Sequence, residues 1–408
     1  MNVSGPEKVA VDTVSVIASS QGDATAIWQL YGSGDGIVKS AARGAGGSWS
    51  APHNLFDDVS DISGSQIAVD SVGNMTAVWV RYDGHSFVVQ SASRPAGGSW
   101  SAPVDLSREG ADSALLAVDP EGEVTAVWLL EREGGNRSVV QGATRPAGGS
   151  WSEPANLSPA KQDAYSPQLA LDPQGGATAV WELENSGAIQ SASRPAGGSW
   201  SASVNLSAAG EWGREPQVAV DAQGNATAVW EGYNPKGVVV QSATRPAGGG
   251  WSAPVDLSEP ARNAEEAQIA VGPQGDATAI WARSNGSDLV VQSATRPAGG
   301  SWSAPVAISA HHGQGGFYPR LVVDSRGNAT AVWKGYDRRR HDSAIQAATR
   351  PLGGGWSSPT DVSDRVTHRR RRISEPQIAV DPQGLSTVVW VIGARSGGII
   401  QAATSVRR

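Results

Sequence analysis

The chain has 408 residues, a formal net charge of −7 and no cysteine, so disulfide bonds and thiolate metal sites are excluded. Its excess of acidic residues argues against general binding to nucleic acids or to anionic membranes. No window contains the roughly eighteen consecutive apolar residues that a membrane-spanning helix needs. The 50 glycines and 24 prolines recur at fixed places in a repeat, so they indicate turns between short elements and not a disordered chain.

The N-terminal segment, Met-Asn-Val-Ser-Gly-Pro-Glu-Lys, has neither the basic region nor the apolar stretch of a signal peptide. We expect a secreted protein whose signal peptide is absent from this sequence, with a cytoplasmic location as the alternative. The first predicted strand covers about 14–18. Two segments precede it, at 2–4 and 8–12, and either is a candidate for an additional strand.

A segment of about fifty residues then recurs eight times. Each copy has a tryptophan in a short apolar stretch, 49 to 57 residues after the previous one. These are Trp28, Trp79, Trp128, Trp181, Trp230, Trp281, Trp333 and Trp390. A repeat of this length is typical of propellers, solenoids and arrays, in which each copy is one supersecondary unit.

One copy shows four predicted strands, A to D, at 217–221, 226–230, 238–242 and 251–257. They are short, rich in β-branched residues and bounded by Gly, Pro, Asn and Asp, without helical periodicity. The A–B connection, Asp-Pro-Gln-Gly at 172–175, suits a type I turn that ends in a left-handed glycine, and Arg-Pro-Ala-Gly-Gly serves the C–D connection in the same way. Both connections are hairpins, so we predict an antiparallel meander.

The eighth copy stops after strand C and lacks the Gly-Gly-x-Trp motif with which the other seven begin strand D. Residues 2–4, which resemble Asn205-Leu-Ser207, or residues 8–12 would supply the missing strand. An open solenoid would carry polar capping repeats, which are not seen here. We therefore predict an all-β fold, a single eight-bladed β-propeller of four-stranded antiparallel blades whose last blade is closed by the N-terminal strand.

The whole chain, 1–408, is predicted to form one propeller domain. Its approximate blades are 14–55, 65–106, 114–157, 167–206, 216–257, 267–308, 319–362 and 376–404, the last completed by a strand within 2–12.

Residues 241–258, Gln-Ser-Ala-Thr-Arg-Pro-Ala-Gly-Gly-Gly-Trp-Ser-Ala-Pro-Val-Asp-Leu-Ser, resemble the Asp-box (BNR) repeat of sialidase-like propellers. The signature Asp of that repeat is replaced here by Pro246 or Ala247, so the boxes are degenerate. The resemblance implies a propeller fold. It does not imply sialidase activity, because the arginine triad, the Tyr nucleophile with its Glu partner and the Asp acid/base of those enzymes are not found as a set.

The lengths of the connections divide the ring into two faces. From the A–B turn glycine to the strand B tryptophan the spacing is six residues in all eight copies, whereas the B–C spacing varies from 9 to 13 and the D–A spacing from 22 to 28. In a meander, the B–C and D–A loops emerge together on what we call the variable face, opposite a constant face of hairpins. Loops on a rigid scaffold often carry binding sites, although they also drift wherever packing does not constrain them.

Several aromatic residues belong to the variable face. Tyr31, Tyr82, Tyr233 and Tyr336 each follow a strand B tryptophan by three residues, where they would line grooves between blades or pack across strands. Trp212, next to Arg214, is the only tryptophan outside the repeat, and it would stack on a sugar, anchor a protein partner or pack within its loop.

His311 and His312 share one loop with Phe317 and Tyr318. Adjacent histidines without a carboxylate are a weak metal signal, so we predict no metal site and no cofactor.

A basic cluster lies within 334–375, which carries ten Lys or Arg and five Asp or Glu. Its candidate ligand-binding residues are Arg338, Arg339, Arg340, Arg369, Arg370, Arg371 and Arg372. Such a cluster would bind phosphate, a sulfated sugar or an acidic protein, or would simply be solvated. On the constant face, hairpin arginines such as Arg296 and turn aspartates such as Asp221 are expected to form surface ion pairs of small energetic value.

No nucleophile elbow, zinc motif, phosphate loop or calcium loop is recognisable, and we assign no catalytic residue. We predict a monomeric, non-catalytic propeller that binds carbohydrate or protein through the variable face. The first alternative is a glycoside hydrolase or lyase of sialidase-like fold that uses acids from the loops of that face. Those acids would be Asp57, Asp61, Glu109, Asp112, Glu131 and Glu184. A structural scaffold or assembly module is the second alternative.

Overall fold

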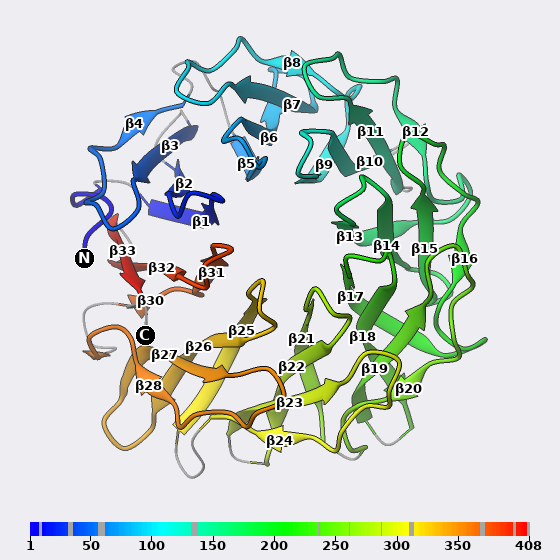
Figure 1. Ribbon diagram of the computed structural model, residues 1–408, viewed down its shortest axis with the longest axis vertical. Helices are drawn as coiled ribbons and strands as arrows, with labels where there is room; N and C mark the ends of the chain where they lie inside the picture. The colour runs from blue at the N-terminus through cyan, green and yellow to red at the C-terminus, as the bar shows by residue number, and fades with distance from the viewer. Residues whose placement is uncertain are drawn as a thin grey trace.

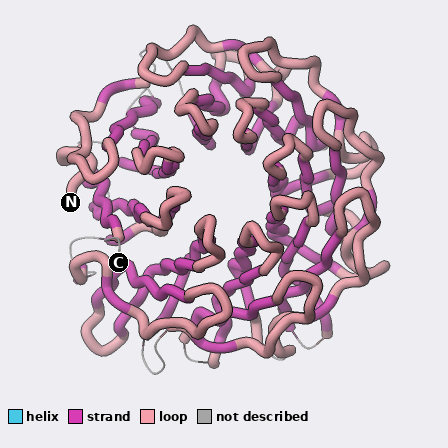
Figure 2. The backbone as a smooth tube through the Cα atoms, viewed as in Figure 1, coloured by secondary structure: helices cyan, strands magenta, loops and turns pink. Residues whose placement is uncertain are grey.

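The computed structural model describes residues 1–7, 10–31, 36–55, 62–131, 138–235, 237–260, 262–286, 288–309, 314–367, 372–394 and 397–405. Eight antiparallel sheets stand around a central axis, and the two ends of the chain lie close together (Figure 1). Figure 2 shows strands and loops but no helix in these ranges, and therefore none that could cross a membrane. The predicted eight-bladed, all-β propeller is confirmed.

The blades are numbered 1 to 8 in chain order, and each runs outward from strand A to strand D (Figure 1). Strands A, nearest the axis, are β1 (Ala10–Ala18), β5 (Ile62–Val69), β9 (Ala111–Val118), β13 (Ala164–Leu171), β17 (Trp212–Val220), β21 (Ala264–Val271), β25 (Gln314–Val323) and, in blade 8, β30 (Arg372–Ile373) with β31 (Gln377–Val380). Strands B are β2 (Ala24–Tyr31), β6 (Met75–Tyr82), β10 (Val124–Glu131), β14 (Ala177–Leu183), β18 (Ala226–Asn234), β22 (Ala277–Ser284), β26 (Ala329–Asp337) and β32 (Ser386–Ala394).

Strands C are β3 (Gly36–Arg43), β7 (Phe87–Arg94), β11 (Ser138–Arg145), β15 (Ile189–Arg194), β19 (Gly237–Arg245), β23 (Leu289–Arg296), β27 (Asp342–Arg350) and β33 (Gly397–Thr404). Strands D are β4 (His53–Asn54), β8 (Val104–Asp105), β12 (Ala155–Asn156), β16 (Val204–Asn205), β20 (Val255–Asp256), β24 (Val306–Ala307) and β28 (Thr360–Asp361), and blade 7 adds β29 (Val366–Thr367) beside β27. Strand D is shorter than the predicted 251–257. Pro254, just ahead of β20, has no N–H for the ladder, so regular pairing begins only after it.

The tryptophans of strand B are buried between blades, and their indole N–H groups explain two other repeated residues. Trp230 donates its Nε1–H to Oε1 of Gln241 at 2.9 Å, and Nε2 of Gln241 donates to Oδ1 of Asp256 at 3.0 Å. Strands B, C and D of one blade are thereby joined through side chains. A buried indole N–H without an acceptor is costly, and the strand C glutamine supplies an acceptor for five of the eight tryptophans.

Residues 2–4 supply the missing strand of blade 8. Gln401 donates to Oδ1 of Asn2 at 3.0 Å, the Val3 N–H donates to the Ile400 carbonyl at 2.8 Å, and the Ile400 N–H donates to Oγ of Ser4 at 3.1 Å. Asn205, Leu206 and Ser207 make the same three contacts in blade 4. The predicted closure by the N-terminus is confirmed, and the other candidate is excluded because 10–12 belong to β1.

The hairpin arginines join neighbouring blades. Nη2 of Arg296 donates to Oγ1 of Thr227 in the preceding blade at 2.8 Å, and its guanidinium lies 5.6 Å from the ring centre of Trp302. Asp221 instead accepts the N–H of Asn225 in its own turn at 2.8 Å. Among the described residues none of these arginines forms an ion pair with a turn aspartate, so that expectation is wrong, and most of the arginines reach inward to threonine hydroxyls between blades.

Val3 provides a test of the closure. Its side chain is 3% exposed and belongs to the core that blades 1 and 8 share. We expect Val3→Asp to destabilise the ring by roughly 3 kcal/mol or more, because it buries an unpaired carboxylate in that core. Thermal unfolding measures this effect. Gly5→Ala is the matched control, because a methyl group at that position would have no neighbour within 4 Å. Equal melting temperatures for the two variants would refute closure by residues 2–4.

Candidate functional site

The inner strands share an irregularity at the end nearer the variable face. In β17 the pairing with β18 shifts between Arg214 and Gln217, which leaves Glu215 and Pro216 as a β-bulge. The first bulge residue is left-handed although it is not glycine, and the same holds in blades 3 to 7. These residues are Ser113 (φ 54°), Ser166 (φ 49°), Glu215 (φ 50°), Glu266 (φ 59°) and Tyr318 (φ 54°). Such residues are strained and bulges redirect side chains, so both features mark positions of functional interest.

Carboxylates of neighbouring blades hold three of these bulges. The Glu215 N–H donates to Oε2 of Glu182 at 3.0 Å, and the Glu266 N–H donates to Oε1 of Glu231 at 2.7 Å. The Tyr318 N–H in turn donates to Oε2 of Glu266 at 2.7 Å. Glu182, Glu231 and Glu266, which we call the glutamate row, therefore run from blade 4 to blade 6 along the inner rim, and Glu266 contacts blade 7.

Arg214 connects the row to Tyr233 of blade 5 and to Glu265 of blade 6. Its Nε lies 2.7 Å from Oε2 of Glu231, and its Nη2 lies 3.6 Å from Oε1 of Glu265. Its guanidinium also lies 5.2 Å from the ring centre of Tyr233, within the range of a cation–π contact. The positive charge of Arg214 is thus already shared between two carboxylates and an aromatic ring.

Trp212 and Tyr233 face each other across β17 and β18 and form the aromatic pocket. This cavity of about 280 Å³ is lined by Gly210, Glu211, Trp212, Tyr233, Asn234 and Pro235. The Trp212 side chain is 54% exposed and that of Tyr233 is 39% exposed. Gly187 of blade 4 accepts the Gly213 N–H at 2.7 Å, and a side chain at Gly187 would collide with the indole. One side of Trp212 therefore packs directly against the Gly187 backbone of blade 4.

Burial raises the pKa values of the three carboxyl groups in the glutamate row. Burial raises the pKa of Glu182, although the hydrogen bond from the Glu215 N–H opposes the shift. Burial also raises the pKa of Glu266, against the hydrogen bond from the Tyr318 N–H. Carboxyl groups with raised pKa values are suited to proton transfer or to pairing with a cation.

The aromatic residues predicted from the sequence fall into separate groups. Trp212, Arg214 and Tyr233 come together in blade 5, and Phe317 and Tyr318 lie with ring centres 6.5 Å apart at the blade 7 end of the glutamate row. Tyr82 packs against Phe87 in blade 2 at 5.2 Å, and the Tyr336 hydroxyl lies 3.3 Å from Nδ1 of His341. The side chain of Tyr31 lies outside the described residues, and so do His311 and His312.

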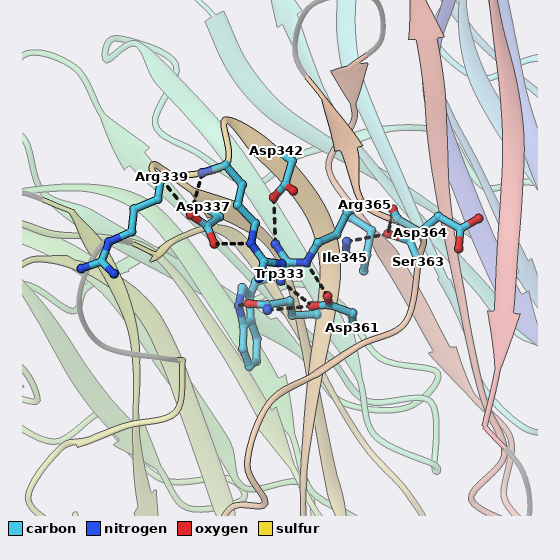
Figure 3. A network of polar contacts seen from close by, with 11 residues as sticks. Trp333, Asp337, Arg339, Asp342, Ile345, Asp361, Ser363, Asp364 and Arg365 are labelled. Atoms are coloured by element: carbon cyan, nitrogen blue, oxygen red, sulfur yellow. Dashed lines mark hydrogen bonds and ion pairs between the residues drawn. The ribbon is translucent and has the colours of Figure 1, made fainter.

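The basic cluster does not form one uncompensated patch among its described members. Arg338 pairs with Asp288 of blade 6 at 2.6 Å, and Nε of Arg340 lies 3.9 Å from Asp337. Figure 3 shows Arg339 directed away from the network in which Arg365 bridges Asp342 and Asp361. Arg372 is exposed at the start of β30, and Arg369, Arg370 and Arg371 lie outside the described residues. Binding of an anion here stays a prediction.

The loop acids considered for catalysis do not make up the glutamate row. Glu109, Asp112 and Glu131 are exposed in blade 3, Glu184 lies 3.4 Å from the Tyr165 hydroxyl, and Asp57 and Asp61 lie outside the described residues. The missed residues occupy strands. Glu182 and Glu231 directly follow the strand B tryptophan, where most copies have an apolar or uncharged residue, and that change at one repeat position was the available signal.

Two larger cavities, of about 390 and 630 Å³, lie on the constant face. The first is surrounded by A–B turns of five blades, and the second lies between blades 2 and 3. Arg145 in the second cavity already donates to Oγ1 of Thr76 at 2.7 Å. Neither cavity is lined by an exposed aromatic ring. Among the described residues, no group of three or more His, Asp or Glu side chains could hold a metal ion.

No protein-family model matches the chain, and no curated protein does either. An ulvan lyase of the polysaccharide lyase family PL25 is 10% identical, and the match covers 98% of this chain and 94% of that one with a TM-score of 0.57. The polysaccharide lyase Uly1 is 9% identical over 82% of this chain and 88% of its own, with a TM-score of 0.53. Prolyl oligopeptidase B from Galerina marginata is 7% identical over 96% and 56%, with a TM-score of 0.53. At these identities, the likeness shows a shared fold alone.

The raised pKa of Glu182 leads to a prediction about stability. A carboxyl group that ionises less readily in the folded chain destabilises that state at neutral pH, and this effect disappears as pH falls toward the ordinary glutamate pKa. Glu182→Gln keeps an oxygen that can accept the Glu215 N–H. We expect its melting temperature at pH 7.5 to exceed that of the wild type by roughly 1 to 2 °C, and the difference to shrink by pH 5. Calorimetry tests this, with Glu153→Gln, an exposed change on the constant face, as control. A difference that grows on acidification would contradict it.

Proposed function

We propose that the protein recognises carbohydrate through the aromatic pocket on the variable face of blade 5. The observation that carries this proposal is the exposed indole of Trp212 beside Tyr233. An exposed, rigid pair of aromatic rings exposes apolar area to water, and that area is regained when the C–H face of a sugar ring covers it. Sugars also need hydrogen-bonding groups at the margin, and Glu211, Asn234 and Arg214 lie there.

Preorganisation supports the same proposal. The indole of Trp212 is held by strand pairing and by Gly187, so little side-chain freedom remains to be lost on binding. Proteins of similar fold include polysaccharide lyases, and one ulvan lyase structure is bound to -[GlcA(1-4)Rha3S]-. We also propose that the chain is related to the Asp-box propellers and that the protein is secreted.

Catalysis on the bound glycan is the second candidate, and the glutamate row favours it. Glu182 and Glu266 have raised pKa values, as a general acid needs, and they lie on the rim in the blades on either side of blade 5. A hydrolase or lyase would release new reducing ends from the polysaccharide that it binds, and Glu266→Gln would abolish that release while binding persists. Unchanged release in Glu266→Gln would exclude the row from catalysis.

Trp212→Ala tests the binding proposal. We expect at least a tenfold loss of affinity for the glycan that a glycan array identifies, roughly 1.4 kcal/mol or more, because the stacking surface is removed. Phe87→Ala is the matched control, because Phe87 is an exposed ring on the same face but in blade 2. Isothermal titration measures both variants. Equal affinities for Trp212→Ala and the wild type would show that the pocket does not bind the glycan.

A further inference from the structure

The exposed aromatic rings mark both ends of a path along the rim. Among the described residues, the aromatic side chains with the largest exposure are Phe87, Trp212, Tyr233 and Tyr318. All but Phe87 lie on the rim of blades 5 to 7, with Tyr318 36% exposed at its left-handed bulge.

Direct contacts join these two ends. Arg214 pairs with Glu231, Glu231 accepts the Glu266 N–H, and Glu266 accepts the Tyr318 N–H. A ligand that touches both the aromatic pocket and Tyr318 would cross from blade 5 to blade 7. A single sugar is too small for that, so the path suits a chain of several sugars.

The charge of the side chains along this path determines whether an anionic or a cationic glycan would bind more favourably. The glutamate row, Glu211, Glu215, Glu265 and Glu375 provide seven carboxylates, and the cations beside them are Arg214, Arg320, Lys334 and Arg372. The formal charge of this set is −3. Arg214 is paired with Glu231 and Glu265, and Arg320 is paired with Glu375 at 3.1 Å. A uronate or sulfate group would therefore meet a surface of net negative charge, on which Arg214 and Arg320 are already paired with carboxylates.

We propose that this path binds an extended cationic glycan, a polymer of amino sugars, from the aromatic pocket to Tyr318. The inference rests on the proposed function and adds the charge and the length of the ligand. Ammonium groups would lie against carboxylates that are partly removed from water, where an opposite charge is worth more than in bulk solvent. The same negative charge would weaken binding of anionic polymers such as that bound by the ulvan lyase.

Isothermal titration with three oligosaccharides of matched length tests this inference. They are a glucosamine oligomer, its N-acetylated neutral counterpart and an oligogalacturonate. We expect the glucosamine oligomer to bind most tightly, the uronate most weakly, and the difference to diminish with added salt. Equal binding of the charged and neutral oligomers, or tightest binding of the uronate, would overturn the charge selection and leave the proposed function intact. Binding of none of the three, with no hit on the glycan array, would overturn the proposed function itself.

Two variants separate the parts of the inference. Glu265→Gln should weaken binding of the glucosamine oligomer about fivefold and leave the neutral oligomer unaffected, because it removes one charge outside the aromatic pocket. Tyr318→Ala should weaken long oligomers but not a disaccharide. Glu153→Gln on the constant face is the charge-matched control, and melting temperatures show that each variant folds. Unchanged affinity of Glu265→Gln for every oligomer would overturn the charge selection. Unchanged affinity of Tyr318→Ala for long oligomers would overturn the extended path.

Discussion

Each blade buries the indole of its strand B tryptophan against the blade before it, and the ring depends on this contact. Trp230, for example, packs with Val180 and Ile189 of blade 4. Removing such an indole from water contributes about 5 kcal/mol before conformational entropy is counted. In five blades the indole N–H donates to the strand C glutamine, and in four of these the amide of that glutamine donates to Asp or Asn in strand D. In those four blades one buried ring therefore links residues of three strands.

Ring closure extends the same contacts to the ends of the chain. Asn2, Val3 and Ser4 take the places that Asn205, Leu206 and Ser207 have in blade 4, and Arg43 crosses the closure to the hydroxyls of Thr387 and Thr404. Seven arginines in all repeat at this position of strand C, but Ser405 stands there in blade 8. The contact from blade 8 back to blade 7 therefore lacks the guanidinium.

Blade 7 has an extra strand, β29, on its outer side, where Arg365 bridges Asp342 and Asp361 (Figure 3).

The repeat was sufficient to predict the propeller, the closure and the two faces, because each follows from periodicity and loop length. Trp212 was found since it breaks the period. The glutamate row was missed because Glu182 and Glu231 sit inside strands, whereas we sought acids in loops. The left-handed bulge that brings Glu266 to the rim has no glycine at its first position in blades 3 to 7. The sequence therefore contains no residue type that would have predicted it.

Pairing between residues far apart in the chain explains why the basic cluster around Arg338 is less positive than the sequence predicted. Arg338 and Asp288 are fifty residues apart in the chain, and only the stacking of blades 6 and 7 places them 2.6 Å from each other. A local charge count therefore overstates the positive character of the cluster around Arg338. The hairpin arginines were misjudged for the same reason, since Thr227, the partner of Arg296, belongs to the preceding blade.

The rim can change in composition without loss of the ring, because its side chains are not part of the indole contact. Equivalent bulge positions carry Ser113, Ser166, Glu215, Glu266 and Tyr318 on one backbone conformation. The left-handed strain at these positions costs on the order of 1 kcal/mol or more each, and a carboxylate that accepts the bulge N–H offsets part of it. Glu231 therefore has two roles, since it stabilises the bulge of blade 6 and neutralises Arg214. The groups that stabilise the bulges of blades 5 to 7 are carboxylates, so these bulges give the rim a negative charge. The same carboxylates therefore affect both the stability of the inner strands and the charge of the ligand that can bind there.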